Sequence, residues 1–366
     1  MTKPRPILLA AGGTGGHLFP AVALATALRE RGAAVELVTD ARALKYGGDI
    51  PVDAIYSIPA ATTTGAGALN KARATVVLGL GLLAALRLIS RLKPRAVAGF
   101  GGYLTVPPLL AASLLGAPSL LHEQNAVVGR ANRLLAPRVS RIATGFSELK
   151  GLGRALAAKT RYTGNPVRPA VIAAAAIPYP GFVDGHLHLL VTGGSQGARV
   201  MADVVPAALA LLSAEERARI RLTMQARGED KGRVAAACAE MQFPVELADF
   251  FADLPARIAR AHLVIGRAGA STVSELAVIG RPSILVPFPH ALDQDQAANA
   301  AILAAADAAT VLPQSAFTPQ RLAELLRGAL ADPAALAKAA AAAQSVGVAN
   351  AADRLADVVL EIARPA

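Results

Sequence analysis

Short apolar runs alternate with longer segments of helical periodicity along most of the chain. The first example is an apolar run over 6–11, a glycine-rich turn, a helical pattern over 18–31 and a second apolar run over 34–39. Strand–helix–strand spacing of this kind predicts parallel strands joined by crossover helices. We therefore expect an α/β protein that begins with a Rossmann-like parallel sheet.

The second half of the chain restarts the same pattern. After further expected strands over 54–58, 96–100, 119–121 and 141–144, residues 164–169 form a proline-rich turn typical of a domain junction. A strand over 187–191, a paired-glycine turn over 192–197 and a helix to about 212 then repeat the N-terminal unit. The expected later strands are 220–225, 245–247, 263–266 and 283–286.

The length of 366 residues also exceeds what one core usually supports. We therefore expect two Rossmann-like domains with parallel sheets, facing each other across a cleft. The boundaries expected from the sequence are 1–164 and 165–347. A last helix within 348–366 is expected to pack back on the first domain.

The net charge of +11 is unevenly distributed between these halves. Residues 1–164 contain 20 Lys and Arg against 7 Asp and Glu, which gives +13, whereas residues 165–366 contain 17 against 19, which gives −2. A basic half indicates an anionic partner such as a membrane surface or a phosphorylated substrate. Nucleic acid is the weaker choice because few aromatic residues accompany these charges. The single cysteine, Cys238, excludes a disulfide framework and indicates a reducing compartment.

An apolar helix flanked by basic residues is expected over 70–93. Its uncharged core, 74–86, would rise only ~20 Å, less than the ~30 Å of a bilayer, so we do not expect it to span a membrane. Two interpretations remain open: a helix that lies at the membrane interface, and an ordinary crossover helix packed on the sheet.

The turn over 11–17 contains four glycines and ends in His17. The N–H groups at the start of the following helix favour an anion or a sugar oxygen, and His17 is the side chain there that exchanges a proton near neutral pH. The spacing lacks the third glycine of the dinucleotide fingerprint. A purely structural turn with Thr14 as a helix cap is the alternative.

Polar residues also follow later strands directly. His122, Glu123 and Asn125 come after the apolar strand over 119–121, and a polar loop over 290–296 follows the strand over 283–286. Such positions lie at the carboxyl edge of a parallel sheet, where α/β proteins bind ligands. The alternative for Asn125 is a helix cap.

The segment over 263–275 is expected to run from strand through a turn of small residues into a helix. Its helix N-terminus is suited to a diphosphate, and Glu275, about one turn inside, is suited to the hydroxyls of a ribose. The alternative role for Glu275 is a favourable interaction with the helix dipole.

Six motifs in series give the chain a family resemblance from residue 7 to about residue 300. They are GGTGGH (12–17), GGY (101–103), HEQN (122–125), GNPVR (164–168), GGSQGAR (193–199) and GASTVSE (269–275). Together they resemble the MurG family, the peripheral membrane N-acetylglucosaminyltransferases that make lipid II for peptidoglycan.

The resemblance implies the GT-B fold and an inverting transfer of N-acetylglucosamine from UDP-GlcNAc to the 4-hydroxyl of a lipid-linked muramoyl-pentapeptide. It implies no tightly bound cofactor or metal. It places the protein at the cytoplasmic face of the bacterial inner membrane, on an anionic surface, with cell-wall synthesis proteins as partners.

The resemblance also implies roles for particular residues. His17 and Glu123 are the candidates for the base that takes the proton of the acceptor hydroxyl, and the choice between them stays open. The residues expected to bind substrate are Thr14, Gly15, Gly16, Asn125, Arg168, Ser195, Phe251, Ala270, Ser271, Thr272, Val273, Ser274, Glu275 and Gln296.

Two other functions fit parts of this pattern. A UDP-N-acetylglucosamine epimerase on the same fold would turn over without a lipid acceptor and would not need the basic apolar helix. A two-domain protein that only binds a nucleotide sugar would leave His17 without a role.

Overall fold

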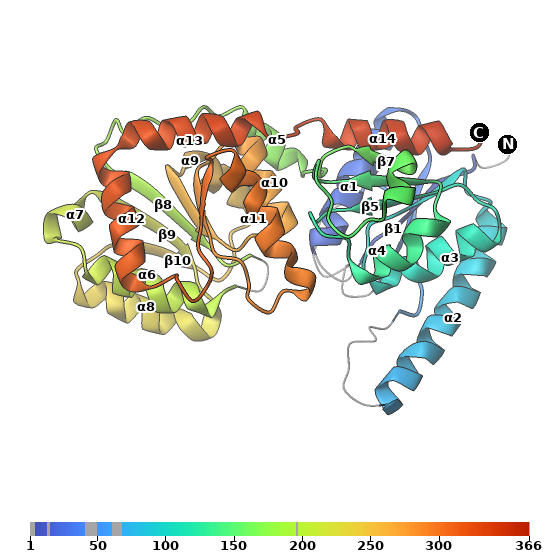
Figure 1. Ribbon diagram of the computed structural model, residues 1–366, viewed down its shortest axis with the longest axis horizontal. Coiled ribbons are helices and arrows are strands. Elements are labelled where there is room, and N and C mark those ends of the chain that lie inside the picture. Colours follow the sequence, from blue (N-terminus) through green and yellow to red (C-terminus); the bar gives the residue numbers. More distant parts are fainter. Residues whose placement is uncertain (1–3, 13–14, 41–49, 61–67, 195–196, 366) are drawn as a thin grey trace. The chain divides into compact units, whose positions relative to one another are not determined.

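The computed structural model describes residues 4–12, 15–40, 50–60, 68–194 and 197–365, with the side chains of 68–72 and 292 excepted. Contacts divide the chain into two compact units. Unit 1 contains Met1–Arg168 and Ala349–Ala366, and unit 2 contains Pro169–Val348. Each unit is a parallel sheet with helices on both faces (Figure 1).

Within the described part of unit 1, seven strands form one parallel sheet. The order starts at one edge with β3 and crosses the first strand of the chain near the middle. The strands in this order are β3 (Ala54–Ser57), β2 (Val35–Thr39), β1 (Ile7–Ala10), β4 (Ala96–Gly99), β5 (Ser119–Glu123), β6 (Arg141–Thr144) and β7 (Thr160–Tyr162).

The side chains of β1 alternate between two hydrophobic cores, as the pleat of a strand requires. Ile7 and Leu9 face the core formed with the first and last helices, whereas Leu8 and Ala10 face the core on the opposite side of the sheet. All four are fully buried. The helices of unit 1 are α1 (Gly15–Glu30), α2 (Ala68–Leu92), α3 (Val106–Leu114), α4 (Arg130–Leu135) and α14 (Ala351–Ile362).

The last helix of the chain, α14, completes unit 1. It packs beside α1, and Leu355 and Val359 are buried in the same core as β1. Ion pairs reinforce this packing, because Arg31 bonds Asp353 and Asp357 while Arg141 bonds Glu361. The C-terminal helix therefore completes the cover of the sheet face that α1 covers only in part.

Unit 2 contains a second parallel sheet, of six strands among the described residues. As in unit 1, the first strand of the unit lies inside the sheet and is followed by a glycine-rich turn. The order is β10 (Val245–Ala248), β9 (Ile220–Gln225), β8 (Leu187–Thr192), β11 (Leu263–Gly266), β12 (Ser283–Leu285) and β13 (Ala309–Val311).

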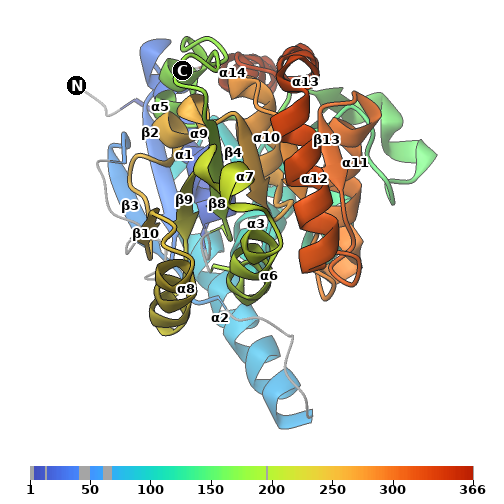
Figure 2. The ribbon, with the colours of Figure 1, turned by 90° about the vertical axis from the view of Figure 1, so that its left-hand side faces the viewer.

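The helices of unit 2 cover both faces of this sheet (Figure 2). On one face α6 lies between α8 and α12, and on the other α10 contacts α5, α9, α11 and α13. The helices are α5 (Pro169–Ala175), α6 (Arg199–Ala210), α7 (Ala214–Ala218), α8 (Gly228–Glu240), α9 (Leu254–Arg260), α10 (Ala270–Ile279), α11 (Asp295–Ala305), α12 (Pro319–Ala331) and α13 (Pro333–Ser345). Cys238 is a buried free thiol in α8.

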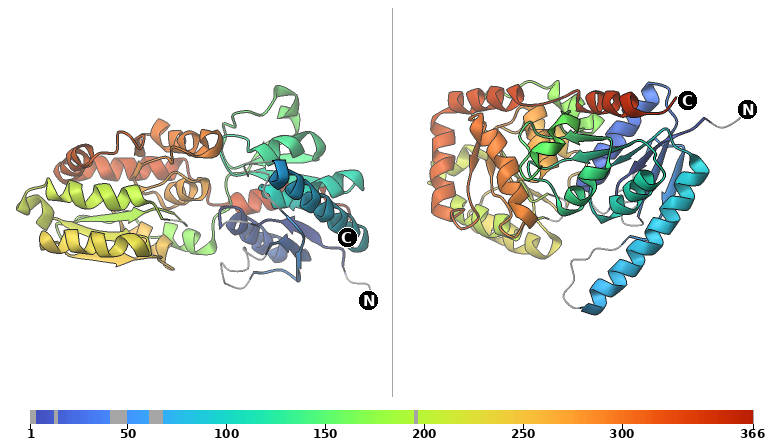
Figure 3. Two further views of the ribbon diagram at one scale, coloured as in Figure 1. Left: turned by 90° about the horizontal axis from the view of Figure 1, so that it is seen from below. Right: turned by 45° about the vertical axis from the view of Figure 1, so that its right-hand side comes forward.

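Helix α2 has two unlike halves. In its C-terminal half, Ala85, Leu88 and Ile89 are buried in the core beside α3. Its N-terminal half extends past the rest of unit 1 (Figure 3), and there Val76 and Leu80 are 62% and 53% exposed. By length and composition the segment Arg73–Leu92 is apolar enough to cross a membrane, which the shorter uncharged stretch in the sequence did not suggest.

Candidate active site

The first glycine-rich turn leads from β1 into α1. Helix α1 begins at Gly15, three residues before the sequence pattern predicts, and Gly16 is exposed in its first turn. The first N–H groups of a helix have no partner within the helix, so this end of α1 favours an anion or an oxygen-rich ligand. Thr14 lies outside the described residues.

His17 follows in the same turn of α1, and its ring lies against a second glycine turn. Gly101 and Gly102, directly after β4, have φ values of 83° and 73°, which only glycine adopts without strain. A Cβ on Gly102 would be 3.4 Å from Nε2 of His17, and one on Gly101 would be 3.5 Å from Cε1. This second turn therefore provides the space for the ring.

The pKa of His17 is lowered from its ordinary value of 6.5. Burial is the largest cause, and the Gln124 side chain and the Phe100 carbonyl act in the opposite direction. His17 is therefore neutral at physiological pH, which is the state that a general base requires.

His122 and Gln124 form a buried network at the end of β5. Nε2 of Gln124 donates to the Phe100 carbonyl (2.9 Å) and lies 3.2 Å from Nδ1 of His122, whose Nε2 lies 3.2 Å from the carbonyl of Gly164. Burial lowers the pKa of His122 to about 4. His122 is therefore a neutral ring that links β5 to the segment after β7.

Glu123 is buried, and its carboxylate accepts four hydrogen bonds from described residues. Oε1 accepts from the backbone (3.0 Å) and side-chain (3.4 Å) nitrogens of Asn125, and Oε2 accepts from Gly129 N (2.9 Å) and Asn132 Nδ2 (2.7 Å). Burial raises the pKa of Glu123, and these donors act against that shift. A carboxylate offers about four acceptor positions, so both oxygens are occupied.

Asn125 therefore lies in the loop that Glu123 organises. The alternative that Asn125 caps the next helix is wrong, because α4 begins at Arg130 with Gly129 at its N-cap. A second asparagine, Asn165, donates to the Gln124 carbonyl (2.9 Å) and so ties the segment after β7 to the same loop.

Arg168 is the last residue of unit 1. Its guanidinium lies over the ring of Phe19 in α1, 4.7 Å from the ring centroid. Arg168 therefore lies beside the first turns of α1, which also contain His17. The motif that contains Arg168 and the motif that contains His17 are far apart in the sequence.

In unit 2 the glycine turn after β8 is folded around the side chain of Gln225. Oε1 of Gln225 accepts from Thr192 Oγ1 (2.8 Å) and Gly193 N (3.2 Å), and Nε2 donates to the carbonyls of Gly194 and Asp249 (both 3.1 Å). A Cβ on Gly193 would be 2.2 Å from the nitrogen of Ala198, so only glycine fits. Ser195, within this turn, lies outside the described residues.

Helix α10 follows β11 after a short turn and contains six of the fourteen residues expected to bind substrate. Gly269 is its N-cap and makes no side-chain cap, so the first N–H groups of the helix remain available to a ligand. The expected ligand-binding residues in its first two turns are Ala270, Ser271, Thr272, Val273, Ser274 and Glu275; Ser274 and Glu275 are largely buried.

Gln296 holds two loops together next to this helix. Its Oε1 accepts from the backbone nitrogens of Ala268 (3.3 Å) and Phe288 (3.0 Å), which follow β11 and β12. Asn299 donates to the carbonyl of Ala268 (3.2 Å) from the same face of α11. Gln296 thus sets the path of the chain that enters α10.

Phe251 is buried, with the guanidinium of Arg257 over its ring at 4.2 Å. The adjacent Phe250 is 70% exposed. The aromatic ring that is open to a ligand in this segment is therefore that of Phe250, and Phe251 supports it from the interior.

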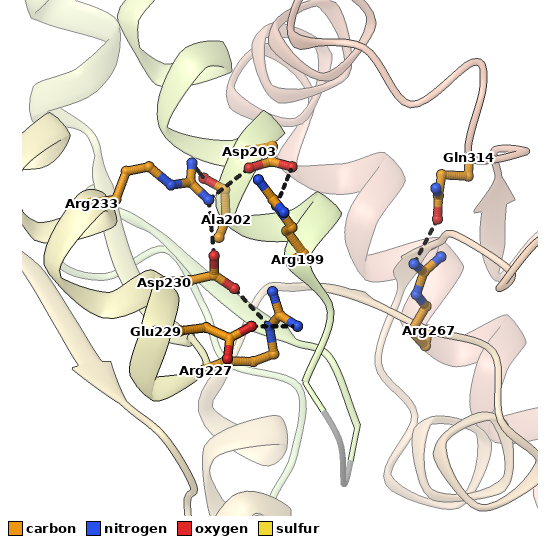
Figure 4. Close-up of polar contacts among 9 residues, drawn as sticks. All are labelled: Arg199, Ala202, Asp203, Arg227, Glu229, Asp230, Arg233, Arg267 and Gln314. Atoms are coloured by element: carbon orange, nitrogen blue, oxygen red, sulfur yellow. Dashed lines mark hydrogen bonds and ion pairs between the residues drawn. The ribbon is translucent and has the colours of Figure 1, made fainter.

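Arginines follow three strands of unit 2 at the carboxyl edge of the sheet (Figure 4). Arg227 bonds Asp230 (2.7 Å) and Glu229 (2.8 Å), and so its charge is paired. Arg267 instead donates to neutral acceptors, the carbonyls of Val286 (3.0 Å) and Pro287 (3.2 Å) and Oε1 of Gln314 (2.7 Å).

No carboxylate among the described residues pairs with Arg267, and burial lowers its pKa. An uncompensated guanidinium here adds positive potential next to the N-terminus of α10. Sequence reasoning missed Arg267 and Gln225 as parts of the site. Their positions could have indicated a role in the site, because Gln225 ends an apolar strand and Arg267 directly follows one.

Metal ligands do not gather in the part of the chain that the structure describes. Among those residues, no group of three or more His, Cys, Asp or Glu side chains is placed to hold a metal ion.

Two doubly wound parallel sheets in one chain, each with a glycine-rich turn at its carboxyl edge, are the architecture of the GT-B glycosyltransferases. Comparison with known proteins identifies the family. The model of the glycosyltransferase family 28 N-terminal domain matches residues 7–144, and that of the family 28 C-terminal domain matches residues 188–355. The chain belongs to glycosyltransferase family 28, and the predicted fold class is confirmed.

Individual relatives of nearly the same length show which kind of enzyme within this family the chain resembles. The chain is 56% identical to the UDP-N-acetylglucosamine–N-acetylmuramyl-(pentapeptide) pyrophosphoryl-undecaprenol N-acetylglucosamine transferase of Methylobacterium nodulans, over 99% of this chain and 98% of the relative. The crystal structure of Acinetobacter baumannii MurG matches with a TM-score of 0.78 at 30% identity, covering 98% of this chain and 100% of that one.

Epimerases share the fold at a much lower similarity. The UDP-GlcNAc 2-epimerase of Neisseria meningitidis, solved with UDP-GlcNAc, matches with a TM-score of 0.68 but only 14% identity, covering 97% of this chain and 99% of that one. This likeness concerns the fold alone, and the expected resemblance to the MurG family is the one that the comparisons confirm.

Proposed function

We propose that this chain is an inverting glycosyltransferase that moves N-acetylglucosamine from UDP-GlcNAc to the 4-hydroxyl of undecaprenyl-pyrophosphoryl-MurNAc-pentapeptide. The reaction converts lipid I into lipid II during peptidoglycan synthesis. The observation that carries the proposal is the 56% identity, over nearly the whole chain, to a transferase named for this reaction.

His17 is the general base in this proposal. As the acceptor oxygen bonds to the anomeric carbon, the proton of its hydroxyl passes to His17, and the bond from that carbon to the diphosphate oxygen breaks with its electron pair leaving on UDP. Lowering of the His17 pKa by burial supports this role, because the ring is then unprotonated before the reaction.

Glu123 has a different task. Its two oxygens already accept four hydrogen bonds, so taking a proton would require at least one of these bonds to break. We assign Glu123 to shaping the loop that contains Asn125 and to holding that loop to Asn132 of α4, and His17 to the proton transfer.

The donor is bound by unit 2 in this proposal. The N-terminus of α10 and the uncompensated charge of Arg267 stabilise the diphosphate as it leaves, which replaces the charge that a metal would supply. Glu275 bonds the ribose hydroxyls, Gln296 orients the loop ahead of α10, and the segment of Phe250 and Phe251 lies near the uracil.

The test is the transfer of radiolabelled N-acetylglucosamine from UDP-GlcNAc to a lipid-linked muramoyl-pentapeptide analogue, beside a control that lacks acceptor. Label in the lipid product supports the proposal. Label that stays water-soluble, with an epimerised sugar or UDP released in the control, supports the epimerase alternative and contradicts the proposal.

We further propose that unit 1 docks on the cytoplasmic face of the bacterial inner membrane through the N-terminal half of α2. Val76 and Leu80 are exposed apolar side chains on that half and Leu83 follows just beyond the middle of the helix, while Arg73 and Arg87 are exposed cations on the same helix. An apolar face with flanking cations binds an anionic interface, and the packed C-terminal half of α2 argues against insertion across the bilayer.

Sedimentation with vesicles that contain an anionic phospholipid tests this docking. We expect Leu80→Glu to reduce the bound fraction several-fold at moderate salt, whereas Leu211→Glu, a control at an exposed leucine of unit 2, should leave it unchanged. Equal binding by both variants would contradict a role for α2.

A further inference from the structure

Neutral oxygens from two separate segments hold the guanidinium of Arg267. Nη1 donates to the carbonyls of Val286 (3.0 Å) and Pro287 (3.2 Å), which follow β12, and Nη2 donates to Oε1 of Gln314 (2.7 Å), which follows β13. Figure 4 shows the side chains of Gln314 and Arg267 pointing toward one another. Of these three acceptors only Gln314 is a side chain, so it is the one that a substitution can change.

The turn that contains Gln314 is anchored in the core of unit 2. The backbone nitrogen of Phe317 donates to the carbonyls of Pro313 (3.1 Å) and Gln314 (3.3 Å), and the Phe317 side chain is buried in that core. The amide of Gln314 therefore reaches Arg267 from a backbone that is itself held in place.

The ring of Phe288 lies beside the same guanidinium. The central carbon of the guanidinium is 5.4 Å from the ring centroid, a distance at which a cation and an aromatic face attract one another. Phe288 is fixed in turn, because its backbone nitrogen bonds Oε1 of Gln296 (3.0 Å) and its ring packs edge-to-face with His290, with the centroids 5.6 Å apart. Contacts in several directions thus determine where the charge of Arg267 lies.

The choice of an amide as the partner distinguishes Arg267 from a neighbouring arginine. Arg233 pairs with the carboxylates of Asp203 (2.7 Å) and Asp230 (3.1 Å), whereas the amide oxygen of Gln314 lies 2.7 Å from Arg267. A glutamate at position 314 would accept the same hydrogen bond, and more strongly, but it would cancel the charge. The amide therefore holds the guanidinium and leaves its positive charge in place.

We propose that Gln314 is a positioning residue that holds Arg267 beside the N-terminus of α10 and keeps its charge available to a diphosphate. Arg267 comes three residues before Ala270, the first residue of α10. The inference rests on the proposed function, in which the diphosphate gains negative charge as its bond to the anomeric carbon breaks. Gln314 makes and breaks no bond in that step; it acts through Arg267, whose charge is already in position when the reaction begins.

A purely structural role for Gln314 predicts a different order of effects. In that case the side chain would only tie the turn after β13 to the segment after β12, and a glutamate, which keeps the acceptor, would be harmless. The proposal predicts that cancelling the charge in Gln314→Glu is more damaging than losing the hydrogen bond in Gln314→Met.

Isothermal titration of the full chain with UDP and with UMP tests this order. We expect Gln314→Glu to raise the Kd of UDP about tenfold and that of UMP by a smaller factor, because the second phosphate is absent from UMP. Gln314→Met should raise the Kd of UDP by about threefold, the effect of one lost hydrogen bond. A Kd of UDP that is no higher in Gln314→Glu than in Gln314→Met, or equal losses for both nucleotides, would overturn the proposal.

The matched control is Gln344→Glu, the same chemical change at an exposed position of α13. Gln344 lies against Gly280, the C-cap at the opposite end of α10, so both affinities should stay unchanged. Thermal denaturation should show that Gln314→Glu is at least as stable as the wild type, because its carboxylate pairs with Arg267. A loss of UDP affinity in that variant is then not a loss of folding.

A double-mutant cycle shows whether Gln314 acts through Arg267. In an Arg267→Met background, Gln314→Glu has no guanidinium to neutralise, so its effect on the Kd of UDP should fall to about threefold or less. The same effect in both backgrounds would mean that the new carboxylate repels UDP directly, and would overturn the proposal. If Arg267→Met does not fold, the comparison of Gln314→Glu with Gln314→Met still decides.

These measurements need no lipid acceptor. A wild-type chain that does not bind UDP would contradict the proposed function itself. Normal binding of UDP by the wild type, with equally normal binding by both Gln314 variants, would overturn the inference about Gln314 alone.

Discussion

The carboxyl edges of the two sheets are built from different chemistry. In unit 1 the polar groups are buried side chains, some joined by neutral hydrogen bonds, such as His122 to Gln124, and one the Glu123 carboxylate with its four donors. The pKa of His17 is lowered by burial there. In unit 2 amide side chains, Gln225 and Gln296, hold the backbone around a helix N-terminus, with Arg267 beside it. In our proposal the first arrangement controls a proton, and the second offers positive potential to an anion.

This difference indicates how two units of the same architecture can contribute different steps to one reaction. The parallel sheet brings loops to one edge in both units, but the side chains at that edge decide what each can do. We expect substitutions in unit 1 to affect turnover or folding, and substitutions in unit 2 to affect affinity for the donor.

The largest expected effect is the loss of the base. His17→Ala should lower kcat by ~10²–10⁴-fold, because the hydroxyl proton then has no acceptor of suitable pKa, and the KM for UDP-GlcNAc should stay within a few-fold. Steady-state transfer of labelled sugar measures both. His188→Ala, at the start of β8, is the control that should retain activity. Unchanged turnover in His17→Ala would remove His17 from the mechanism.

Glu123→Ala should act on stability. It leaves N–H groups of Asn125, Gly129 and Asn132 without their acceptor in a buried loop, which should reduce the free energy of unfolding by about 3–5 kcal/mol. Chemical denaturation followed by circular dichroism measures this loss. The control is Glu240→Ala, an exposed carboxylate at the end of α8, which should change it by less than about 0.5 kcal/mol. A stable but inactive Glu123→Ala would return Glu123 to the role of base.

Gln225→Leu tests whether a substitution in unit 2 affects donor affinity and not turnover. The substitution removes the side chain that holds Gly193, Gly194 and Asp249, so the glycine turn should lose its shape and the KM for UDP-GlcNAc should rise about tenfold, or ~1.4 kcal/mol. Gln320→Leu, at an exposed position of α12, provides the control. If Gln225→Leu lowered kcat by the same factor and left KM unchanged, the separation of affinity from turnover would fail.

The pH dependence gives the smallest effect and sharpens the assignment of the base. Burial lowers the pKa of His17 below 6.5, so the ring stays neutral as the pH falls through that value. The acidic limb of kcat/KM should therefore have its midpoint below pH 6.5, with a plateau above it. Measurement of initial rates from pH 5 to 8 tests this, and a midpoint above 6.5 would contradict the environment that we describe.

The sequence was enough to predict the two sheets and where their polar edges lie. Runs such as Ile7–Ala10 and Leu187–Thr192 are apolar enough to indicate buried parallel strands. The residues that follow each run then lie at the carboxyl edge of the sheet by geometry alone. Short edge strands such as β13 (Ala309–Val311) escaped prediction, because three partly exposed residues carry little periodic signal.

The contacts within the site were beyond the sequence. Whether Glu123 or His17 can take the acceptor proton depends on which neighbours bond the carboxylate. Two of these neighbours, Gly129 and Asn132, are the N-cap and a residue of α4. The tautomer of His122 depends on the carbonyl of Gly164, 42 residues away. Such pairings depend on tertiary packing, which no local pattern encodes.

The measurement that tests the division between the units most directly pairs donor affinity with turnover for two variants. Isothermal titration of UDP-GlcNAc gives Kd, and transfer of labelled sugar to the lipid acceptor gives kcat, for His17→Ala and for Glu275→Ala. The account predicts that His17→Ala loses turnover and keeps its Kd, whereas Glu275→Ala weakens Kd about tenfold or more, with the folded protein intact. Equal losses of Kd and kcat in both variants, or the reverse pattern, would contradict it.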